Sequence, residues 1–256
     1  MKIPLLELRH AVALVLVSGP FTAFAESSDV SVVLVHGAFS DGSAWHKVIP
    51  ILQDAGVPVS AAQMPLSSLA DDAAVVSRLI ERQDGSVVLV GHSYGGNVIT
   101  ETGSHDKVEA LVYVAGFALD AGQALADLSE GEPPAPWQSE AIADAEGFIR
   151  LSDRGIAQFF APDLPADEVA VIAATQGPFQ YKITYEAPSV AAWSIRPTYY
   201  VLAENDQIIP PRLQGYFAER IGAEITTIAS SHVAMLSQPE AVAEVILGAV
   251  ETIAQD

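Results

Sequence analysis

The chain contains no cysteine among its 256 residues. That absence excludes disulfide bonds, thiolate nucleophiles and cysteine-ligated metal sites, so the fold must be stabilised by its core. Basic residues are also scarce, with 12 Lys and Arg against 32 Asp and Glu, which gives a formal net charge of -20. Nucleic acid and anionic membrane surfaces would repel such a chain, and neither is expected as a partner.

Long apolar runs are missing as well, so no membrane span is expected in the mature chain. The N-terminal 25 residues instead have the pattern of a secretory signal peptide. A basic start with Lys2 and Arg9 precedes an apolar run over residues 11–17, and Ala23-Phe24-Ala25 supplies small residues for cleavage. We therefore expect export to the periplasm or the medium after cleavage near Ala25, with a buried N-terminal helix as the alternative.

Hydrophobic residues make up 50% of the chain, enough for the core of one large domain over residues 26–256. Short Val- and Ile-rich runs alternate with longer helix-compatible segments. Because the short runs are continuously apolar, they predict parallel strands covered on both faces. We expect a doubly wound, mainly parallel sheet of about six strands, over residues 31–35, 57–61, 86–90, 108–114, 198–202 and 224–228. Helices are expected over residues 44–55, 69–83, 95–104, 210–221 and 239–253.

Residues 119–196 interrupt this alternation. The segment is helix-compatible and has no convincing strand, so it predicts a helical cap inserted over the carboxyl ends of the strands, where such folds bind substrates. Ordinary surface helices are the alternative. Aromatic residues of the segment could line a pocket or simply pack; they are Trp137, Phe148, Phe159, Phe160, Phe179, Tyr181 and Trp193.

The G-x-S-x-G pattern around Ser93 lies between a predicted strand and a predicted helix. In that context a sharp turn exposes the serine hydroxyl above the sheet edge, and the turn is so tight that it requires glycine at positions 91 and 95. A plain Ser/Gly turn after a buried strand is the alternative. We interpret Ser93 as a candidate nucleophile.

A serine nucleophile needs a general base, and the base needs an orienting acid. Only His105 and His232 follow Ser93 in the chain, and His105 lies about three helical turns away. His232 follows the last predicted strand, on the same sheet edge as Ser93. The acid is expected after the preceding strand, where Asp206 is the first choice and Glu204 the second.

The loop after the first strand supplies the second expected element, an oxyanion hole. The backbone N–H groups of Ala38 and of Tyr94, the residue after the nucleophile, are the expected donors. His36 and His92 are interpreted as supporting residues rather than proton carriers. Gly37 lets the backbone come close to the site.

Together these residues resemble the esterase/hydroxynitrile lyase group of α/β-hydrolases, from about residue 31 to residue 253. The matching motifs are Val33-Leu34-Val35-His36-Gly37-Ala38-Phe39 with Ala44-Trp45, Gly91-His92-Ser93-Tyr94-Gly95-Gly96, Asn205-Asp206-Gln207-Ile208-Ile209-Pro210-Pro211 and Ser231-His232-Val233-Ala234-Met235-Leu236-Ser237-Gln238-Pro239. The resemblance implies an α/β-hydrolase fold and ester hydrolysis. Lyases of the group carry Lys after the catalytic His and Thr at the position of Gly37; Val233 and Gly37 depart from both.

The resulting hypothesis is a serine hydrolase that cleaves small to medium, largely apolar carboxylic esters, with no metal or organic cofactor. Phe39, Phe117, Trp137 and Phe160 are the expected substrate-binding residues. A lyase-like relative, cleavage of lactones or amides, and a ligand-binding receptor on a hydrolase scaffold remain alternatives. The sequence does not specify an oligomeric state.

Overall fold

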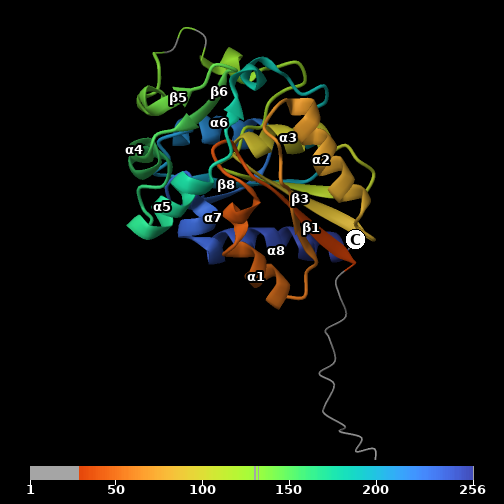
Figure 1. Cartoon of the computed structure of the whole chain (residues 1–256). Helices are drawn as coiled ribbons and strands as arrows, with labels where there is room; N and C mark the ends of the chain where they lie inside the picture. The colour runs from red at the N-terminus through yellow and green to blue at the C-terminus, as the bar shows by residue number, and fades with distance from the viewer. Residues whose placement is uncertain (1–28, 130, 132, 256) are drawn as a thin grey trace, which may run out of the picture.

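The computed structural model describes residues 29–129, 131 and 133–255 (Figure 1). The predicted signal peptide, residues 1–25, lies outside them. At the centre is a six-stranded parallel sheet in the order β2-β1-β3-β4-β8-β9. Its strands are β1 (Val30–Val35), β2 (Val59–Ala61), β3 (Ser86–His92), β4 (Val108–Val114), β8 (Thr198–Ala203) and β9 (Glu224–Ile228). The predicted doubly wound α/β architecture is confirmed.

Burial on both faces explains why these strands read as unbroken apolar runs. All six residues of β1 are buried, and so is every residue of β3 except Ser86 at its start. Because both faces are covered, side chains pointing either way enter the hydrophobic core. The register pairs Val33 with Leu89 and Leu89 with Leu111, which stacks apolar side chains across the three central strands.

Helices cover both faces of the sheet (Figure 1). α1 and α8 contact each other on one face, and α2 and α3 contact each other on the other, while α6 packs on β8. The bounds are α1 (Val48–Asp54), α2 (Leu69–Glu81), α3 (Tyr94–Thr102), α6 (Pro211–Arg220), α7 (Ala234–Ser237) and α8 (Pro239–Gln255). None of the helices in the described part of the chain has the length and apolar character needed to cross a bilayer.

The continuous helix expected over residues 44–55 is wrong. The structure has a short 3-10 helix, η1 (Gly42–Trp45), followed by α1. Pro50 accounts for the break, because its nitrogen has no proton to donate to residue 46 and its ring would clash with that carbonyl in a continuous helix. In the observed structure Pro50 lies in the first turn of α1, where proline is tolerated.

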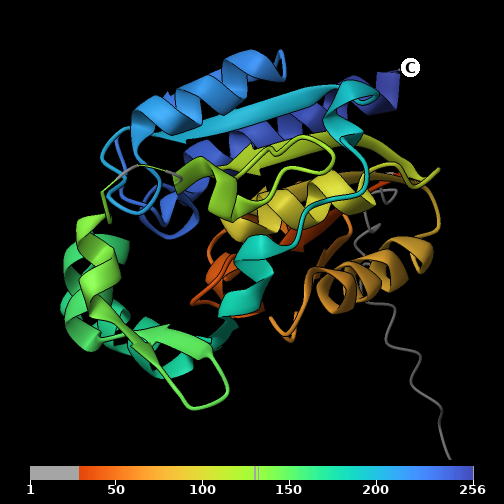
Figure 2. The same cartoon turned by 90° about the horizontal axis from the view of Figure 1, so that it is seen from above.

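The inserted segment lies over the carboxyl end of the sheet, but it is not purely helical (Figure 2). It contains an antiparallel sheet of β5 (Ala141–Ala143), β6 (Phe148–Leu151) and β7 (Phe179–Gln180). The expectation of no strand is wrong because strands of two to four residues leave no recognisable periodicity. Its helical elements are η2 (Leu125–Ser129), η3 (Pro136–Glu140), α4 (Asp153–Gly155), η4 (Ile156–Phe160), α5 (Ala166–Thr175), η5 (Tyr181–Tyr185) and η6 (Ala192–Ser194).

Four loops at the carboxyl edge of the sheet carry the candidate site residues. Residue 37 follows β1 and Ser93 follows β3, while Asp206 follows β8 and His232 follows β9. Parallel strands place all their carboxyl ends at one edge, so residues far apart in the chain converge there. The inserted segment, called the cap below, faces this edge (Figures 1 and 2).

Candidate active site

Ser93 sits in a strained turn between β3 and α3. Its φ of 53° and ψ of -123° lie outside the usual regions for a residue with a side chain. The turn is fixed by hydrogen bonds from the Ser93 N–H to the Val114 carbonyl at 3.2 Å, and from the Gly96 and Phe117 N–H groups to the Ser93 carbonyl at 2.9 and 3.1 Å. Strain that the surroundings hold in place is typical of functional turns.

The two flanking glycines permit this turn by leaving no Cβ. A Cβ on Gly91 would lie 2.5 Å from the Gly95 carbonyl oxygen, and one on Gly95 would lie 2.6 Å from the carbonyl oxygens of Val35 and His36. Neither distance is compatible with a side chain. The glycines expected from the motif therefore have a steric explanation in the structure.

The loop after β1 lies directly against Ser93. A Cβ on Gly37 would lie 2.7 Å from the Cβ of Ser93 and 3.0 Å from Nδ1 of His92. Ala38 follows in the chain and is buried, and Tyr94 is the first residue of α3. The first expected oxyanion donor, Ala38, therefore belongs to the loop that touches Ser93 through Gly37, and the second, Tyr94, is the next residue in the chain.

His36 braces this loop. Its Nδ1–H donates to the Gly37 carbonyl at 2.8 Å, and its Nε2 accepts from the Met64 N–H at 3.0 Å. Burial lowers the pKa of His36, which favours the neutral imidazole that these two bonds require. Its hydrogen bonds are those of a supporting residue.

His232 and Asp206 form a fully buried pair. The Nδ1–H of His232 donates to Oδ2 of Asp206 at 2.7 Å, and both side chains are 0% exposed. Glu204, the second choice for the acid, is instead exposed just beyond β8. The other ring nitrogen, Nε2 of His232, is buried and has no hydrogen-bond partner among the described residues. An imidazole held through Nδ1 with Nε2 unoccupied is arranged to accept a proton.

Asp206 is held in place by three further donors. Its Oδ1 accepts from the N–H groups of Ile208 and Ile209 at 2.7 and 3.0 Å, and its Oδ2 accepts from Nε2 of Gln214 at 2.8 Å. Gln214, in α6, is 0% exposed and also accepts from the Ala203 N–H at 3.0 Å. These bonds satisfy the buried carboxylate and fix its orientation toward His232.

His92 connects the serine turn to the histidine loop. Its Nε2–H donates to the backbone carbonyl of His232 at 2.9 Å, and the two imidazole rings are 4.7 Å apart. Burial, with a smaller contribution from His232, lowers the pKa of His92 well below its ordinary value. His92 is thus a neutral anchor that brings the neighbourhood of Ser93 to His232.

The cap also holds the histidine loop. Oδ2 of Asp163 accepts from the Ser231 N–H at 2.7 Å, and the Ser231 hydroxyl donates to the Phe160 carbonyl at 3.4 Å. Asp163 and Gln214 were not found from the sequence, because neither belongs to a recognisable motif.

Aromatic side chains from the core and the cap cover the site. The ring of Phe160 lies 5.2 Å from that of His232 and 6.5 Å from that of Phe39. Phe39 also contacts Trp137 at 6.1 Å and Phe179 at 6.2 Å, all edge to face. Three of the four expected substrate-binding residues therefore form one aromatic cluster, which contacts His232 through Phe160. The fourth, Phe117, packs its ring against Phe217 in α6 and borders Ser93 through its backbone.

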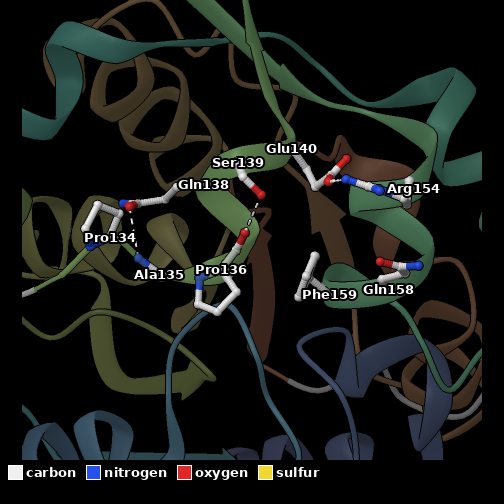
Figure 3. A pocket seen from close by; sticks show the side chains of 9 residues that line it. All are labelled: Pro134, Ala135, Pro136, Gln138, Ser139, Glu140, Arg154, Gln158 and Phe159. Atoms are coloured by element: carbon white, nitrogen blue, oxygen red, sulfur yellow. Dashed lines mark hydrogen bonds and ion pairs between the residues drawn. The ribbon is translucent and has the colours of Figure 1, made fainter.

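With this cover in place Ser93 is only 5% exposed. A crevice of about 130 Å³ opens between α5 and the loop after β1, lined by Ser40, Asp41, Ser43, Ala44, His46, Glu168, Val171, Ile172, Thr175 and Leu236. A larger, open hollow of about 560 Å³ lies on the cap, where Glu140 pairs with Arg154 (Figure 3). Neither is lined by Ser93, Asp206 or His232.

A second buried acid lies close to the serine turn. Asp72, in α2, accepts from the Tyr94 hydroxyl at 2.8 Å and from the Leu66 N–H at 2.8 Å. Burial raises the pKa of Asp72 to about 6. No set of three or more His, Asp or Glu side chains suited to a metal ion occurs within the residues that the structure describes.

Comparison with known proteins adds a family match and three likenesses to individual proteins. A model of the alpha/beta hydrolase family matches residues 32–245. The chain is 23% identical over 243 residues to Pyrethroid hydrolase of Sphingobium wenxiniae, covering 84% of this chain and 85% of that protein. It is 26% identical over 245 residues to Salicylic acid-binding protein 2 of Nicotiana tabacum, covering 81% and 92%. The crystal structure of polyneuridine aldehyde esterase is similar, with a TM-score of 0.75 and 21% identity, over 86% of this chain and 98% of that one.

Proposed function

Because the chain belongs to the alpha/beta hydrolase family, we propose that it is a serine hydrolase that cleaves small to medium, largely apolar carboxylic esters. One observation carries the proposal: the buried His232, oriented by Asp206, keeps Nε2 without a hydrogen-bond partner beside the strained turn of Ser93. The Pyrethroid hydrolase and polyneuridine aldehyde esterase relatives support an ester as the bond that is cleaved.

In the first half of the proposed reaction Ser93 is the nucleophile. Its Oγ attacks the ester carbonyl carbon while Nε2 of His232 takes the hydroxyl proton. Asp206 keeps the Nδ1 proton in place and stabilises the imidazolium that forms. When the tetrahedral intermediate collapses, the C–O bond breaks, and Nε2–H gives its proton to the departing alcohol.

The second half releases the acid. Water attacks the acyl group on Ser93, and His232 takes a proton from that water before returning it to the serine oxygen. In both halves the negative charge develops on the carbonyl oxygen. The backbone N–H groups of Ala38 and Tyr94 are the proposed donors to it, and losing one such donor typically costs about 3–4 kcal/mol of transition-state stabilisation.

The walls of the site favour an apolar substrate. Phe39, Phe160 and Phe179 are buried and contact one another through Phe39. Phe160 also contacts His232, and Phe179 contacts Tyr94. We therefore expect the acyl or alcohol group to be uncharged. A panel of p-nitrophenyl and alkyl esters, with acyl chain length crossed against alcohol size, measures this preference.

Replacement of Ser93 tests the proposal. Ser93→Ala should lower kcat by roughly 10⁴- to 10⁶-fold while leaving the melting temperature close to that of the unmodified protein. Ser194→Ala is the matched control, because its exposed hydroxyl donates to the Ala191 carbonyl. An active-site phosphonate should label the unmodified protein and the control but not Ser93→Ala. Near-normal turnover by Ser93→Ala would remove the serine from its role.

Two alternative functions can be tested on the same protein preparation. A hydroxynitrile lyase of this group would release cyanide from cyanohydrins; Val233, an apolar buried residue, stands where the lyases carry Lys. A receptor would bind a small ligand without turnover, a possibility raised by the name of the tobacco relative. Cyanide release without ester cleavage would favour the first, and stoichiometric binding without turnover would favour the second. Lactones and amides belong in the same substrate panel.

A further inference from the structure

Asp72 is a buried acid for which the reaction described above has no use. It lies in the first turn of α2 and is 0% exposed. No ion pair of the described residues includes it. The charged groups that face it, Asp71 of the same helix and Glu186 of the cap, are acidic as well. Burying a carboxyl without a cation is costly, so its hydrogen bonds must be important to the fold or to the site.

Those hydrogen bonds join two separate segments. Oδ2 accepts from the hydroxyl of Tyr94, the residue after Ser93, and Oδ1 accepts from the backbone N–H of Leu66. Leu66 belongs to the loop of residues 62–68, between β2 and α2, and it has a positive φ of 55°. A non-glycine residue in that region needs its surroundings to hold it. Asp72 holds the loop at that strained point.

The 62–68 loop reaches the other side of the site as well. The Met64 N–H donates to Nε2 of His36, and the Nδ1–H of the same ring donates to the Gly37 carbonyl next to Ala38. The Leu66 carbonyl accepts from the Gln180 N–H at 2.9 Å in β7 of the cap. One loop therefore contacts the segment that carries Ala38, the cap strand and, through Asp72, the residue after the nucleophile.

Aromatic packing completes the same connection. The ring of Tyr94 lies 5.1 Å from that of Phe179, and Phe179 lies 6.2 Å from Phe39, the residue after Ala38. A shift of the Tyr94 side chain would thus displace both proposed oxyanion donors, the backbone N–H groups of Tyr94 and Ala38. Catalytic groups displaced by about 1 Å can cost on the order of 100-fold in rate.

We propose that Asp72 is a positioning residue for ester cleavage, which holds Tyr94 and the 62–68 loop so that the backbone N–H groups of Tyr94 and Ala38 point at the reacting carbonyl oxygen. This inference rests on the proposed function. Because oxyanion donors act on charge that develops in the transition state, disturbing them lowers kcat rather than raising KM.

The chemistry of the site predicts which substitution can replace Asp72. An Asn side chain can accept from the Leu66 N–H through its oxygen and donate to the Tyr94 hydroxyl oxygen through its amide, so both connections survive. An Ala side chain makes neither bond and leaves the two donors buried without acceptors. A role that depends only on charge would not be rescued by Asn.

The test compares kcat and KM for ester cleavage, with the active sites counted by phosphonate labelling. Asp72→Ala should lower kcat about 10- to 100-fold and change KM less than about threefold. Asp72→Asn should keep kcat within about threefold of the unmodified enzyme, and Tyr94→Phe should lower it about three- to tenfold. Tyr113→Phe is the matched control: it removes another buried tyrosine hydroxyl, which bonds to the Thr100 hydroxyl rather than to Asp72, and should leave kcat unchanged.

Several results would overturn the inference. They are an unchanged kcat in Asp72→Ala, a loss confined to KM, or a loss in Asp72→Asn as large as that in Asp72→Ala. If Asp72→Ala does not fold, the test rests on Tyr94→Phe. A loss of kcat in Tyr94→Phe no greater than that in Tyr113→Phe would overturn the proposal. If the unmodified protein turns over no ester, the proposed function fails and this inference fails with it. If the unmodified protein turns over esters and Ser93→Ala does not, the proposed function holds. An unchanged kcat in Asp72→Ala would then disprove only the positioning role of Asp72.

Discussion

Gly37 and Ser93 approach so closely that a Cβ on Gly37 would lie 2.7 Å from the Ser93 Cβ. The same Cβ would lie 3.0 Å from Nδ1 of His92 and 3.1 Å from its carbonyl oxygen. The loop after β1 and the turn after β3 therefore fix each other through backbone contact. Any side chain at position 37 must push one of them aside.

Gly37→Ala should consequently impair catalysis more than folding. We expect kcat/KM for ester cleavage to fall by about 100-fold, because the added methyl group displaces Ser93 or the loop that carries Ala38. The free energy of unfolding should fall by about 1–3 kcal/mol, the usual cost of overpacking. Steady-state kinetics and urea denaturation measure the two effects.

Gly248→Ala is the matched control for that substitution. Gly248 lies within α8, and a Cβ there would meet nothing within 4 Å. The variant should keep its activity and gain roughly 0.5–1 kcal/mol of stability, because alanine favours the helix. Wild-type kinetics in Gly37→Ala would contradict the tight approach.

The sequence locates those site residues that directly follow a strand. Ser93, Asp206 and His232 each follow a strand of a parallel sheet, so knowledge of the strands places them at one edge. Gln214, Asp163 and Asp72 could not be found in this way. Each reaches the site from a helix or from the cap, by a contact that depends on tertiary packing rather than on local spacing.

The cap shows the same limit at the level of secondary structure. Its strands are too short to show the alternation of apolar and polar residues that marks a strand. The turn between β5 and β6, however, contains residues typical of a β-turn. Asp144 accepts from the N–H groups of Glu146 and Phe148, and Gly147 has a positive φ of 83°. An Asp followed three residues later by Gly is typical of such turns. The residues of this turn therefore indicate a hairpin between β5 and β6.

Asp206 and Glu204 give a direct test of which acid orients His232. Asp206→Asn should lower kcat by about 10⁴-fold, because an amide in place of the carboxylate favours the wrong imidazole tautomer. Glu204→Gln, two residues away and exposed, should leave kcat unchanged. Equal losses in the two variants, measured with p-nitrophenyl acetate at one pH, would contradict the assignment of Asp206.

Gln214 should prove important although it touches no reacting atom. Gln214→Leu removes the donor to Oδ2 of Asp206 and the acceptor for the Ala203 N–H. We expect kcat to fall about tenfold as Asp206 loses its orientation, and the free energy of unfolding to fall by about 1–3 kcal/mol because buried polar groups lose partners.

Gln83→Leu provides the comparison for Gln214. Gln83 follows the end of α2, and its amide donates to the carbonyl of Leu79 within that helix. Among the described residues, this side-chain bond does not involve Asp206 or His232. The kcat of Gln83→Leu should equal that of the unmodified enzyme. A Gln214→Leu variant that loses stability but keeps its full kcat would show that Asp206 is oriented without this bond.

The ionisation of Asp72 should make stability depend on pH in an unusual direction for an acid. Burial raises the pKa of Asp72 from 3.8 to about 6 in the folded protein, with Asp71 and Glu186 as smaller causes. Below the unfolded pKa, folded and unfolded chains both hold the proton. As the pH rises toward about 6, the unfolded chain releases the proton first, so stability from this group declines through that window and is constant above it.

Asp72→Asn does not titrate, so it should gain stability relative to the unmodified protein as the pH rises from about 4 to about 7, by on the order of 1–3 kcal/mol. Urea denaturation at several pH values measures the difference.

Asp71→Asn is the control of opposite sign. Hydrogen bonds from Ser68 and Ser67 lower the pKa of Asp71 in the folded protein, so the unmodified protein loses that stabilisation as the pH falls. Relative to the unmodified protein, the Asp71 variant should therefore lose stability as the pH rises. Parallel stability curves for the Asp72 variant and the unmodified protein would mean that folding does not raise the pKa of Asp72.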